Sequence, residues 1–423
     1  VAMVFQHFSL FEAMSVAENI SLGMENPPSR RELAARIREV SNAYKLPLDP
    51  DRIIGDLSVG ERQRVEIIRC LLQNPKLLIM DEPTSVLTPQ EVDVLFETLN
   101  KLSSEGTAIL YISHKLEEIR TLCHHATILR HGKVVDNCDP TQQTARRLAE
   151  MMVGSALHIP AKKNLHPGEV LLEVDHLTAR SRTPFGTSLK DISLKVRSGE
   201  VMGIGGVAGN GQDELLAALS GEILVKRDMI RVLNVDTGDL RPNERRELGL
   251  LTAPEERLGH AAAPNMSLTE NAMLTAHQRQ KLTTGGFLRW NAARGFARAI
   301  VKQFDVRTPG IANAARSLSG GNLQKFVIGR EILQNPRVLV VNQPTWGVDA
   351  AAASAIRQAL MNLAEAGAAV VVISQDLDEL LEMSDRLAIL NEGRLSVPAE
   401  AADLTIEAIG LMMGGMEAAD VPA

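Results

Sequence analysis

The chain has 423 residues, of which 45% are hydrophobic, 23% charged and 3% aromatic, and its formal net charge is −7. This composition is typical of a folded α/β protein, it argues against a disordered or membrane-spanning chain, and the length favours two domains. The acidic balance argues against a nucleic-acid-binding surface. No apolar run approaches a spanning helix and the first residues lack the features of a secretory signal, so we expect a protein of the cytosol.

The first half has the pattern of an α/β domain, which we place at residues 1–155. A helical segment, LSVGERQRVEIIRCLLQNP, begins at Leu57 and ends at an Asn-Pro pair. An aliphatic run follows at residues 76–80, and after another helical segment a second run follows at 108–113. Aliphatic runs separated by helical segments predict parallel strands buried on both faces.

Polar residues follow both predicted strands. Asp81 and Glu82, in the stretch LLIMDEPTS, come after the first strand, at the edge of the sheet where open α/β folds bind ligands. Asp81 could hold Mg²⁺ through water, and Glu82 could orient or deprotonate an attacking water. His114 follows the second strand and could reach a terminal phosphate. The alternative is that an acidic pair after a strand belongs to an ordinary turn. Pro83, Thr84 and the histidine after the second strand argue against this alternative.

The second half repeats the first. A non-periodic, proline-containing stretch at residues 156–169 is the predicted linker, and residues 170–423 form the second predicted domain. Equivalent positions of the two halves keep a constant offset of 261 residues, as Ser58 and Ser319 do. A fixed register over this length indicates duplication.

The two copies are unequal in their reactive residues. The second copy has Asn342 and Gln343 in place of the two carboxylates and Gln375 in place of the histidine. An amide cannot act as a general base, so the catalytic positions of the second copy are neutralised. The first copy, in turn, has only five residues before Gln6, whereas the second has 85 between Val170 and the corresponding glutamate.

The second copy contains a glycine-rich loop, GVAGNGQD, at residues 206–213. Its spacing is that of a loop that cradles phosphates, and a bare structural turn is the alternative. Gln212 and Asp213 stand where such a loop has its lysine and its Mg²⁺-binding hydroxyl. The loop could hold a nucleotide but is poorly suited to hydrolysis. Its candidate phosphate-binding residues are Gly206, Gly209, Gly211, Gln212 and Asp213.

The start of the repeated helix also differs between the copies. The second copy reads LSGGN, which can present a hydroxyl and backbone N–H groups to a phosphate at a helix N-terminus. The first copy reads LSVGE, and its added negative charge should weaken phosphate binding. The candidate nucleotide-binding residues are Ser319, Gly320, Gly321 and Asn322 in the second copy, and Ser58 and Gly60 in the first.

Together, FQHF, LSGGN, MDEPTS and ISH resemble the ATP-binding subunits of ABC transporters over nearly the whole chain. The tandem arrangement is similar to the double-domain ATPases of sugar and nucleoside importers, and VFQHFSLFEAMSVAENI, GVAGNGQ and QPT look closer to the nucleoside, lipoprotein-dependent branch. The resemblance implies two P-loop ATPase domains, each with a helical subdomain, that use ATP and Mg²⁺. It also implies membrane permease subunits and a substrate-binding protein or lipoprotein as partners, no nucleic acid, and a peripheral place on the cytoplasmic face of the membrane.

In that family two such domains pair head to tail, and each ATP lies between the core of one domain and the signature sequence of the other. The signature sequence is LSGGN in the second copy and LSVGE in the first. The resemblance implies that Gln6, Asp81, Glu82 and His114 face the intact signature, with Gln6 sensing the γ-phosphate and sharing the Mg²⁺ site with Asp81. The altered core of the second copy would face LSVGE. One site would then consume ATP, and the other would be regulatory or structural.

Two alternatives stay open. A soluble ABC protein acting on ribosomes or nucleic acid should have a long charged linker and a basic surface. A catalytically inactive remnant is the other alternative, because the family places a phosphate-binding lysine before the position of Gln6, and this chain contains no such residue there. If the polypeptide begins at Val1, we expect little ATPase activity from it.

Overall fold

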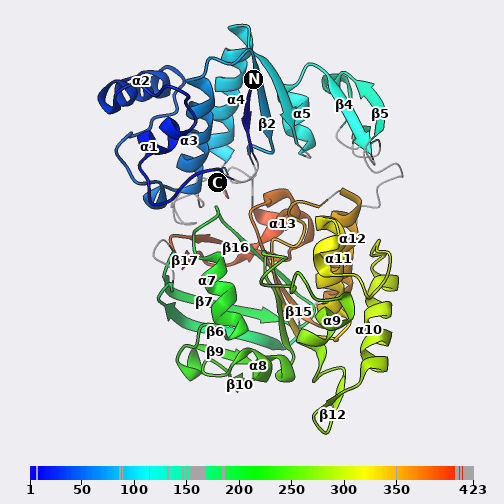
Figure 1. Cartoon of the computed structure of the whole chain (residues 1–423). Coiled ribbons are helices and arrows are strands. Elements are labelled where there is room, and N and C mark those ends of the chain that lie inside the picture. The colour runs from blue at the N-terminus through cyan, green and yellow to red at the C-terminus, as the bar shows by residue number, and fades with distance from the viewer. Residues whose placement is uncertain are drawn as a thin grey trace. The chain divides into compact units, whose positions relative to one another are not determined.

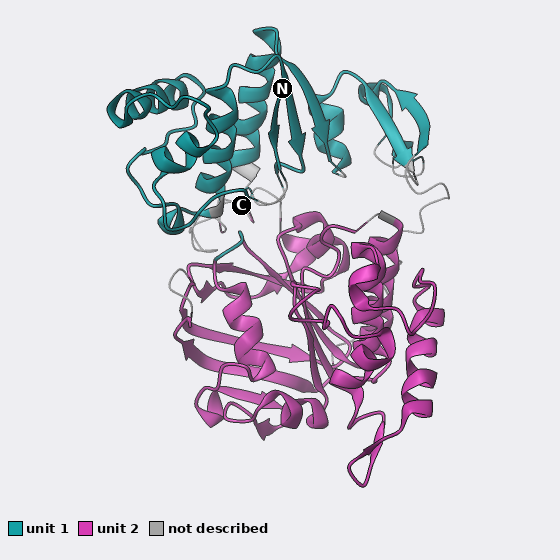
Figure 2. Ribbon diagram, viewed as in Figure 1, with its two compact units in different colours: residues 1–157, 207–209 teal, residues 158–206, 210–423 magenta. Residues whose placement is uncertain are grey.

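The computed structural model describes residues 1–5, 8–84, 87, 89–113, 115–130, 133–144, 147, 148, 151, 168–182, 186–348, 350–404, 409 and 412. The chain divides into two compact units (Figure 2): unit 1 contains residues 1–157 and 207–209, and unit 2 contains residues 158–206 and 210–423. The predicted linker, 156–169, lies almost wholly outside the described residues.

Unit 1 is built on a parallel sheet with the strand order β1-β2-β3, against which helices pack (Figure 1). Its core is formed mainly by aliphatic side chains of the sheet and of the helices α1, α2, α3 and α4. The strands are β1 (Ala2–Val4), β2 (Leu77–Asp81) and β3 (Ala108–Ile112), with an antiparallel pair, β4 (Ala126–Arg130) and β5 (Lys133–Cys138). The helices are α1 (Val16–Leu22), α2 (Arg30–Ala43), η1 (Ile54–Asp56), α3 (Val59–Leu71), α4 (Pro89–Ser104), α5 (Leu116–Leu122) and η2 (Pro140–Gln142).

Unit 2 contains a seven-stranded sheet, in the order β11-β14-β15-β8-β16-β17 with β18 beside β16, and a four-stranded antiparallel sheet, β10-β9-β6-β7. The strands are β6 (Val170–Ala179), β7 (Leu189–Arg197), β8 (Val201–Gly205), β9 (Ile230–Val232), β10 (Val235–Asp236), β11 (Leu250–Ala253), β12 (Thr283–Thr284), β13 (Phe287–Leu288), β14 (Val338–Asn342), β15 (Ala369–Ser374), β16 (Arg386–Asn391), β17 (Arg394–Leu395) and β18 (Ala399–Glu400). The helices are α7 (Gln212–Ser220), η3 (Arg227–Met229), α8 (Pro242–Leu248), α9 (Leu268–Ala276), α10 (Trp290–Gln303), η4 (Ala315–Ser317), α11 (Gly320–Ile332), α12 (Ala350–Glu365), α13 (Leu377–Met383) and η5 (Ala401–Asp403).

The duplication read from the sequence is present in the elements themselves. Helices α3 and α11 begin at residues 59 and 320, strands β2 and β14 at 77 and 338, and helices α5 and α13 at 116 and 377, a difference of 261 in each pair. The predicted α/β fold with parallel strands is therefore confirmed, and each strand end that carries candidate site residues has a counterpart in the other unit.

The two copies differ in how well their sheets are covered. Strand β15 lies between β14 and β8, and all of its residues are buried. Its counterpart β3 pairs with β2 alone among the described residues, so Leu110 and Ile112 remain 51% and 44% exposed. The aliphatic sequence of β3 is that of a central strand, yet in the described part of unit 1 it forms an edge.

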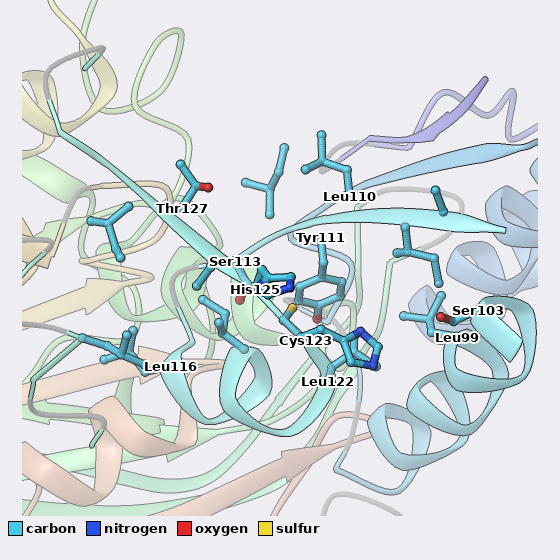
Figure 3. Close-up of a pocket in the computed structure, with 18 of the residues that line it drawn as sticks. Leu99, Ser103, Leu110, Tyr111, Ser113, Leu116, Leu122, Cys123, His125 and Thr127 are labelled. Atoms are coloured by element: carbon cyan, nitrogen blue, oxygen red, sulfur yellow. The ribbon is translucent and has the colours of Figure 1, made fainter. Parts of the chain in front are cut away.

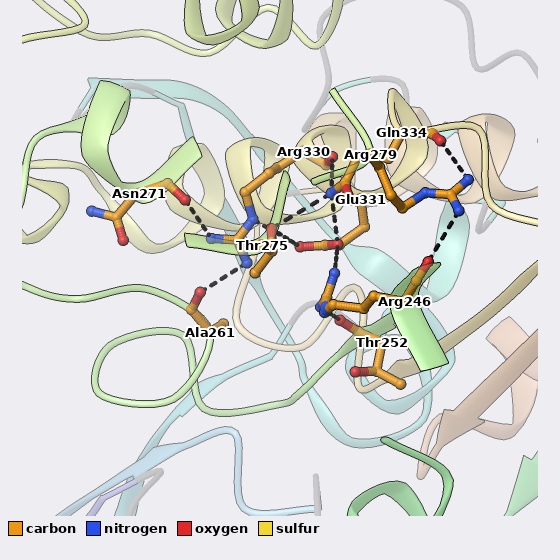
Figure 4. A network of polar contacts seen from close by, with 9 residues as sticks. All are labelled: Arg246, Thr252, Ala261, Asn271, Thr275, Arg279, Arg330, Glu331 and Gln334. Carbon is orange, nitrogen blue, oxygen red and sulfur yellow. Dashed lines mark hydrogen bonds and ion pairs between the residues drawn. The ribbon is translucent and has the colours of Figure 1, made fainter. Parts of the chain in front are cut away.

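A buried ion network fixes helix α11 to its neighbours in unit 2 (Figure 4). Glu331 is fully buried and accepts hydrogen bonds from Arg246 of α8 at 2.7 Å, from Arg330 at 2.8 Å and from Thr275 of α9 at 3.0 Å. Burial alone would raise the pKa of Glu331, but the two guanidinium groups hold this pKa below its ordinary value. The carboxylate thus joins three helices through charge-assisted hydrogen bonds.

Unit 1 has the arginine of this network, but the carboxylate that pairs with it is at a different position of the repeat. Arg69, which corresponds to Arg330, forms an ion pair with Glu66, a fully buried carboxylate one turn earlier in α3. Glu66 also accepts from the backbone N–H of Ser9 at 2.9 Å, and Arg69 donates to the Ser9 carbonyl at 3.1 Å. Both copies therefore hold the loop that precedes their helical segment with an arginine paired to a buried carboxylate, since Arg330 donates to the carbonyl of Ala261 at 2.9 Å.

Candidate functional site

Strand β2 places the two predicted carboxylates at the carboxyl edge of the unit 1 sheet. Asp81 ends the strand, in register with Ile112 of β3, and Glu82 follows with a left-handed backbone φ of 46°. The N–H of Glu82 donates to the carbonyl of Ile112 at 2.9 Å, and both acidic side chains are half-buried. A left-handed non-glycine residue persists only where its surroundings fix it, so this turn is held in one conformation.

Two other predicted site residues of unit 1, Gln6 and His114, lie outside the described residues. Their roles stay predictions from the sequence.

The matching turn of unit 2 has the same backbone without the carboxylates. Gln343 has a φ of 50°, and its N–H donates to the carbonyl of Ile373 at 2.8 Å. Its side-chain oxygen accepts from the N–H of Gln375 at 3.4 Å, and the Asn342 amide donates to Asp213 at 3.0 Å. The turn is thus maintained by amides, none of which can accept a proton from water.

The glycine-rich loop of the second copy joins β8 to α7, both of which belong to unit 2. Gly209 and Gly211 have positive φ values of 84° and 109°, which a residue with a side chain rarely adopts. The buried side chain of Gln212 folds back into the loop: its oxygen accepts from the N–H of Asn210 at 3.0 Å, and its nitrogen lies 2.9 Å from where a Cβ on Gly206 would stand. The amide therefore occupies the inside of the loop and brings no positive charge to it.

Unit 2 also has two neighbouring carboxyl groups, beside this loop, whose ionisation is disfavoured. Burial, followed by the charge of Asp213, raises the pKa of Glu255 to about 7 although Arg257 opposes this shift. Burial, followed by the charge of Glu214, raises the pKa of Asp213. Two carboxyls beside a loop without a lysine oppose the binding of a triphosphate.

The helices that begin at the signature sequences, α3 and α11, differ in whether side chains form hydrogen bonds with the backbone of their first turn. At the start of α3, the hydroxyl of Ser58 accepts from the N–H of Glu61 and the Glu61 carboxylate accepts from the N–H of Ser58 at 2.8 Å, which forms a capping box. Arg52 also binds Glu61, at 2.6 Å. At the start of α11, Ser319 makes no side-chain bond to the helix backbone, and its exposed hydroxyl accepts from the Asn322 amide at 2.9 Å.

The first backbone N–H groups of α11 are thus available to an anion. In α3 the side chain of Ser58 already accepts a hydrogen bond from the first turn. The S-x-x-E pattern at residues 58–61 is the sequence signal from which this capping box could be predicted.

The signature glycines have different surroundings. A Cβ on Gly320 would lie 2.6 Å from the Arg257 guanidinium, and Gly320 itself is exposed. Gly321 is half-buried, and Gly60 is buried against the carboxylate of Glu91. Gly60 corresponds to Gly321 and serves packing in unit 1, whereas Gly320, the counterpart of Val59, lets the Arg257 guanidinium approach the start of α11.

A cavity of about 830 Å³ lies elsewhere in unit 1, beside β3, α5 and β4 (Figure 3). Its lining is mostly apolar and includes Leu110, Tyr111, Leu116, Leu122 and Cys123. It contains neither Asp81 nor Glu82. In unit 2, β8 runs between β15 and β16, the counterparts of β3 and β4, so the cavity matches the position of a core strand and not that of a reactive site.

Comparison with known proteins gives the class to which this fold and these turns belong. Residues 1–85 and 189–346 match the family described as ABC transporter. The chain is a member of this family, and within it of the ATP-binding proteins of transporters, whose activity is ATP hydrolysis.

Two relatives align over nearly the whole chain. The chain is 38% identical to the nucleoside import ATP-binding protein NupA of Lactococcus lactis subsp. cremoris, over 98% of this chain and 83% of that protein. It is 36% identical to the glucose import ATP-binding protein TsgD13 of Haloferax volcanii, over 98% of this chain and 82% of that protein. Among solved structures, an RNase-L inhibitor is 20% identical, with a TM-score of 0.61 over 92% of this chain and 71% of that one, a likeness of fold alone.

In the part of the chain that the structure describes, no helix is both long and apolar enough to cross a membrane.

Proposed function

We propose that this chain hydrolyses ATP to energise the import of nucleosides, and that unit 1 carries the reactive carboxylates. The observation that carries the proposal is the pair of matching turns: the turn after β2 presents Asp81 and Glu82, whereas the same turn after β14 presents only amides. The names of the relatives support import of a small organic solute, and the nucleoside importer supports the finer assignment.

The chemistry follows from the residue types. Glu82 would accept a proton from the attacking water or orient it, since the N–H bond of Glu82 to Ile112 holds the backbone that carries its carboxylate. Asp81 offers the hard oxygen atoms that Mg²⁺ prefers, and the side-chain oxygen of Gln6 is of the same kind. When bound, Mg²⁺ supplies positive charge to the phosphate oxygens. Ser319, with the unsatisfied N–H groups at the start of α11, would bind phosphate oxygens.

Unit 2 would bind nucleotide weakly or serve a structural role. Gln212 fills its loop, and Asp213 and Glu255 place carboxyls where the phosphates would lie. We assign Gly206, Gly209 and Gly211 to this weaker site. Ser58 and Gly60 would belong to the weaker signature, because the capping box already engages the Ser58 hydroxyl.

The proposed partners are membrane permease subunits, which would form the pathway, and a substrate-binding protein or lipoprotein that delivers the solute. The chain would then work as a peripheral subunit on the cytoplasmic face of the membrane. Nucleic acid is not among the proposed partners, since the net charge of −7 offers no basic surface.

The proposal is tested by uptake of labelled solutes into source cells with and without the gene for this chain. We expect deletion to abolish uptake of a labelled nucleoside and to leave uptake of labelled glucose and ribose unchanged. The intact gene should restore nucleoside uptake, while a Glu82→Gln gene should not. Loss of sugar uptake in place of nucleoside uptake would show that the solute is a sugar, and unchanged uptake of all three would contradict the import function.

A further inference from the structure

The carboxylate of Glu118, in helix α5, is the centre of a buried hydrogen-bond cluster in unit 1. It accepts from the hydroxyl of Thr84 at 2.6 Å, from that of Tyr111 at 2.7 Å and from that of Ser113 at 3.2 Å. Glu118 is 9% exposed and Thr84 is 2% exposed. A carboxylate that accepts three hydroxyl hydrogen bonds away from solvent forms strong, charge-assisted contacts.

The three donors come from the segments that surround the reactive turn. Thr84 lies two residues after Glu82, in the turn that leaves β2, while Tyr111 and Ser113 belong to the end of β3. Lys115 completes the cluster, with its ammonium 3.6 Å from Glu118 and 3.4 Å from the carbonyl of Thr84. Glu118 therefore fastens the turn to β3 on one side and to α5 on the other.

The tyrosine hydroxyl stays a donor in this cluster. Burial, followed by the charge of Glu118, raises the pKa of Tyr111 above its ordinary value. Figure 3 shows Tyr111, near the end of β3, and Ser113, two residues further along the chain.

The same arrangement recurs in unit 2, in residues offset by 261. Glu379 of α13 accepts from the hydroxyl of Thr345 at 2.7 Å and from that of Ser374 at 2.8 Å. The tyrosine has no counterpart there, because Val372 occupies its position. Burial raises the pKa of Glu379 to about 7. The turn that Glu379 holds presents Gln343 where unit 1 presents Glu82.

We infer that Glu118 is a positioning residue for ATP hydrolysis: through its hydrogen bond to Thr84 it fixes the turn that aims the Glu82 carboxylate at the attacking water. This inference rests on the proposed function of unit 1. The Glu82 backbone is held on one side by its N–H bond to Ile112 and has an unfavourable left-handed φ. The Thr84–Glu118 bond supplies a further fixed point, beside the contact of Lys115 with the Thr84 carbonyl, so its loss loosens the turn. A displacement of about 1 Å in a reacting group is enough to cost on the order of a hundredfold in rate.

The experiment compares two matched substitutions in the complete transport assembly, purified with its membrane subunits. Thr84→Val removes the hydroxyl at nearly constant volume, and Thr345→Val removes the equivalent hydroxyl of unit 2. We expect Thr84→Val to lower kcat for ATP by about tenfold or more, with KM changed by less than about twofold, because the turn acts on the chemical step. Thr84→Ser, which keeps the hydroxyl, should restore kcat to within about threefold of the original.

Thr345→Val removes a hydrogen bond of the same kind from a turn without a carboxylate, so kcat should stay within about twofold. If both valine variants lower kcat equally, or if Thr84→Val raises KM and leaves kcat unchanged, the positioning role is wrong. If the unsubstituted assembly hydrolyses ATP and Thr84→Val leaves both constants unchanged, the inference alone fails. If the unsubstituted assembly hydrolyses no ATP, the proposed function fails and the inference fails with it.

Discussion

Glu255 shows how a single residue separates the two copies. It stands in unit 2 where unit 1 has Gln6, so an amide has become a carboxyl. Burial and the neighbouring charge of Asp213 raise the pKa of Glu255 to about 7, from an ordinary value of 4.5. A carboxyl in such surroundings is partly protonated near neutral pH, whereas the glutamine of unit 1 is neutral at every pH.

This pKa makes the stability of unit 2 dependent on pH. Between pH 4.5 and about 7 the folded chain keeps a proton on Glu255 that the unfolded chain has released. The folded state then binds more protons, so the contribution of Glu255 to the free energy of unfolding is largest below pH 4.5 and falls as the pH rises to about 7. The raised pKa of Asp213 acts in the same direction.

Replacing Glu255 by glutamine should remove most of this dependence. We expect the Glu255→Gln variant to unfold in urea with a free energy that changes less between pH 5 and pH 8, by on the order of 2 kcal/mol. Tryptophan fluorescence is a suitable probe, because the two tryptophans of the chain, Trp290 and Trp346, both belong to unit 2. An identical pH dependence in the variant and the unsubstituted protein would show that Glu255 ionises normally.

At the scale of the element, helices α3 and α11 begin at equivalent positions, but only the serine before α3 caps its helix. Ser58 caps α3 through its bond to the Glu61 N–H, whereas Ser319 makes no such bond to α11. The side chain at the third helical position decides the difference: Glu61 completes a capping box, while Asn322 donates to the Ser319 hydroxyl.

Alanine substitutions should separate these uses. Ser58→Ala should destabilise unit 1 by about 1 kcal/mol, the usual worth of an N-cap, and lower ATP turnover by a small factor. Ser319→Ala should leave the stability of unit 2 nearly unchanged and lower turnover at least about tenfold, because a phosphate ligand is lost. Thermal unfolding and phosphate release measure the two quantities. Equal losses of turnover in both variants would contradict the distinction between the two starts.

The sequence predicted the elements of this fold better than their contacts. The offset of 261 residues correctly paired helix α3 with α11 and strand β2 with β14, because duplicated segments keep the same hydrophobic pattern. The buried carboxylate that pairs with the helix arginine could not be located in this way, since Glu66 and Glu331 occupy different positions of the repeat. Carboxylates at two different positions of the helix can pair with the equivalent arginine, and only the packed structure shows which one each copy uses.

The same holds for the site. Asp81 and Glu82 were predicted at the edge of the sheet and lie there, because a strand followed by a turn fixes their place locally. The contacts of Glu118 were not predicted, because the hydroxyls of Thr84 and Tyr111 meet it only after β2, β3 and α5 have packed.

At the scale of the whole molecule, the chain contains two versions of one fold that have diverged in charge. Unit 1 has carboxylates at the turn after β2 and a signature helix closed by its own side chains. Unit 2 has amides at the corresponding turn, a lysine-free loop filled by Gln212 and a signature helix whose start is open. The proposed proton-accepting step therefore belongs to unit 1, whose turn carries Glu82.

The most direct test of this assignment is the rate of phosphate release by the complete transport assembly with Glu82→Gln and, separately, with Gln343→Asn. We expect Glu82→Gln to lower kcat by about a hundredfold or more, because the general base is lost, while Gln343→Asn keeps kcat within about twofold. Equal losses in the two variants, or normal turnover with Glu82→Gln, would contradict the account.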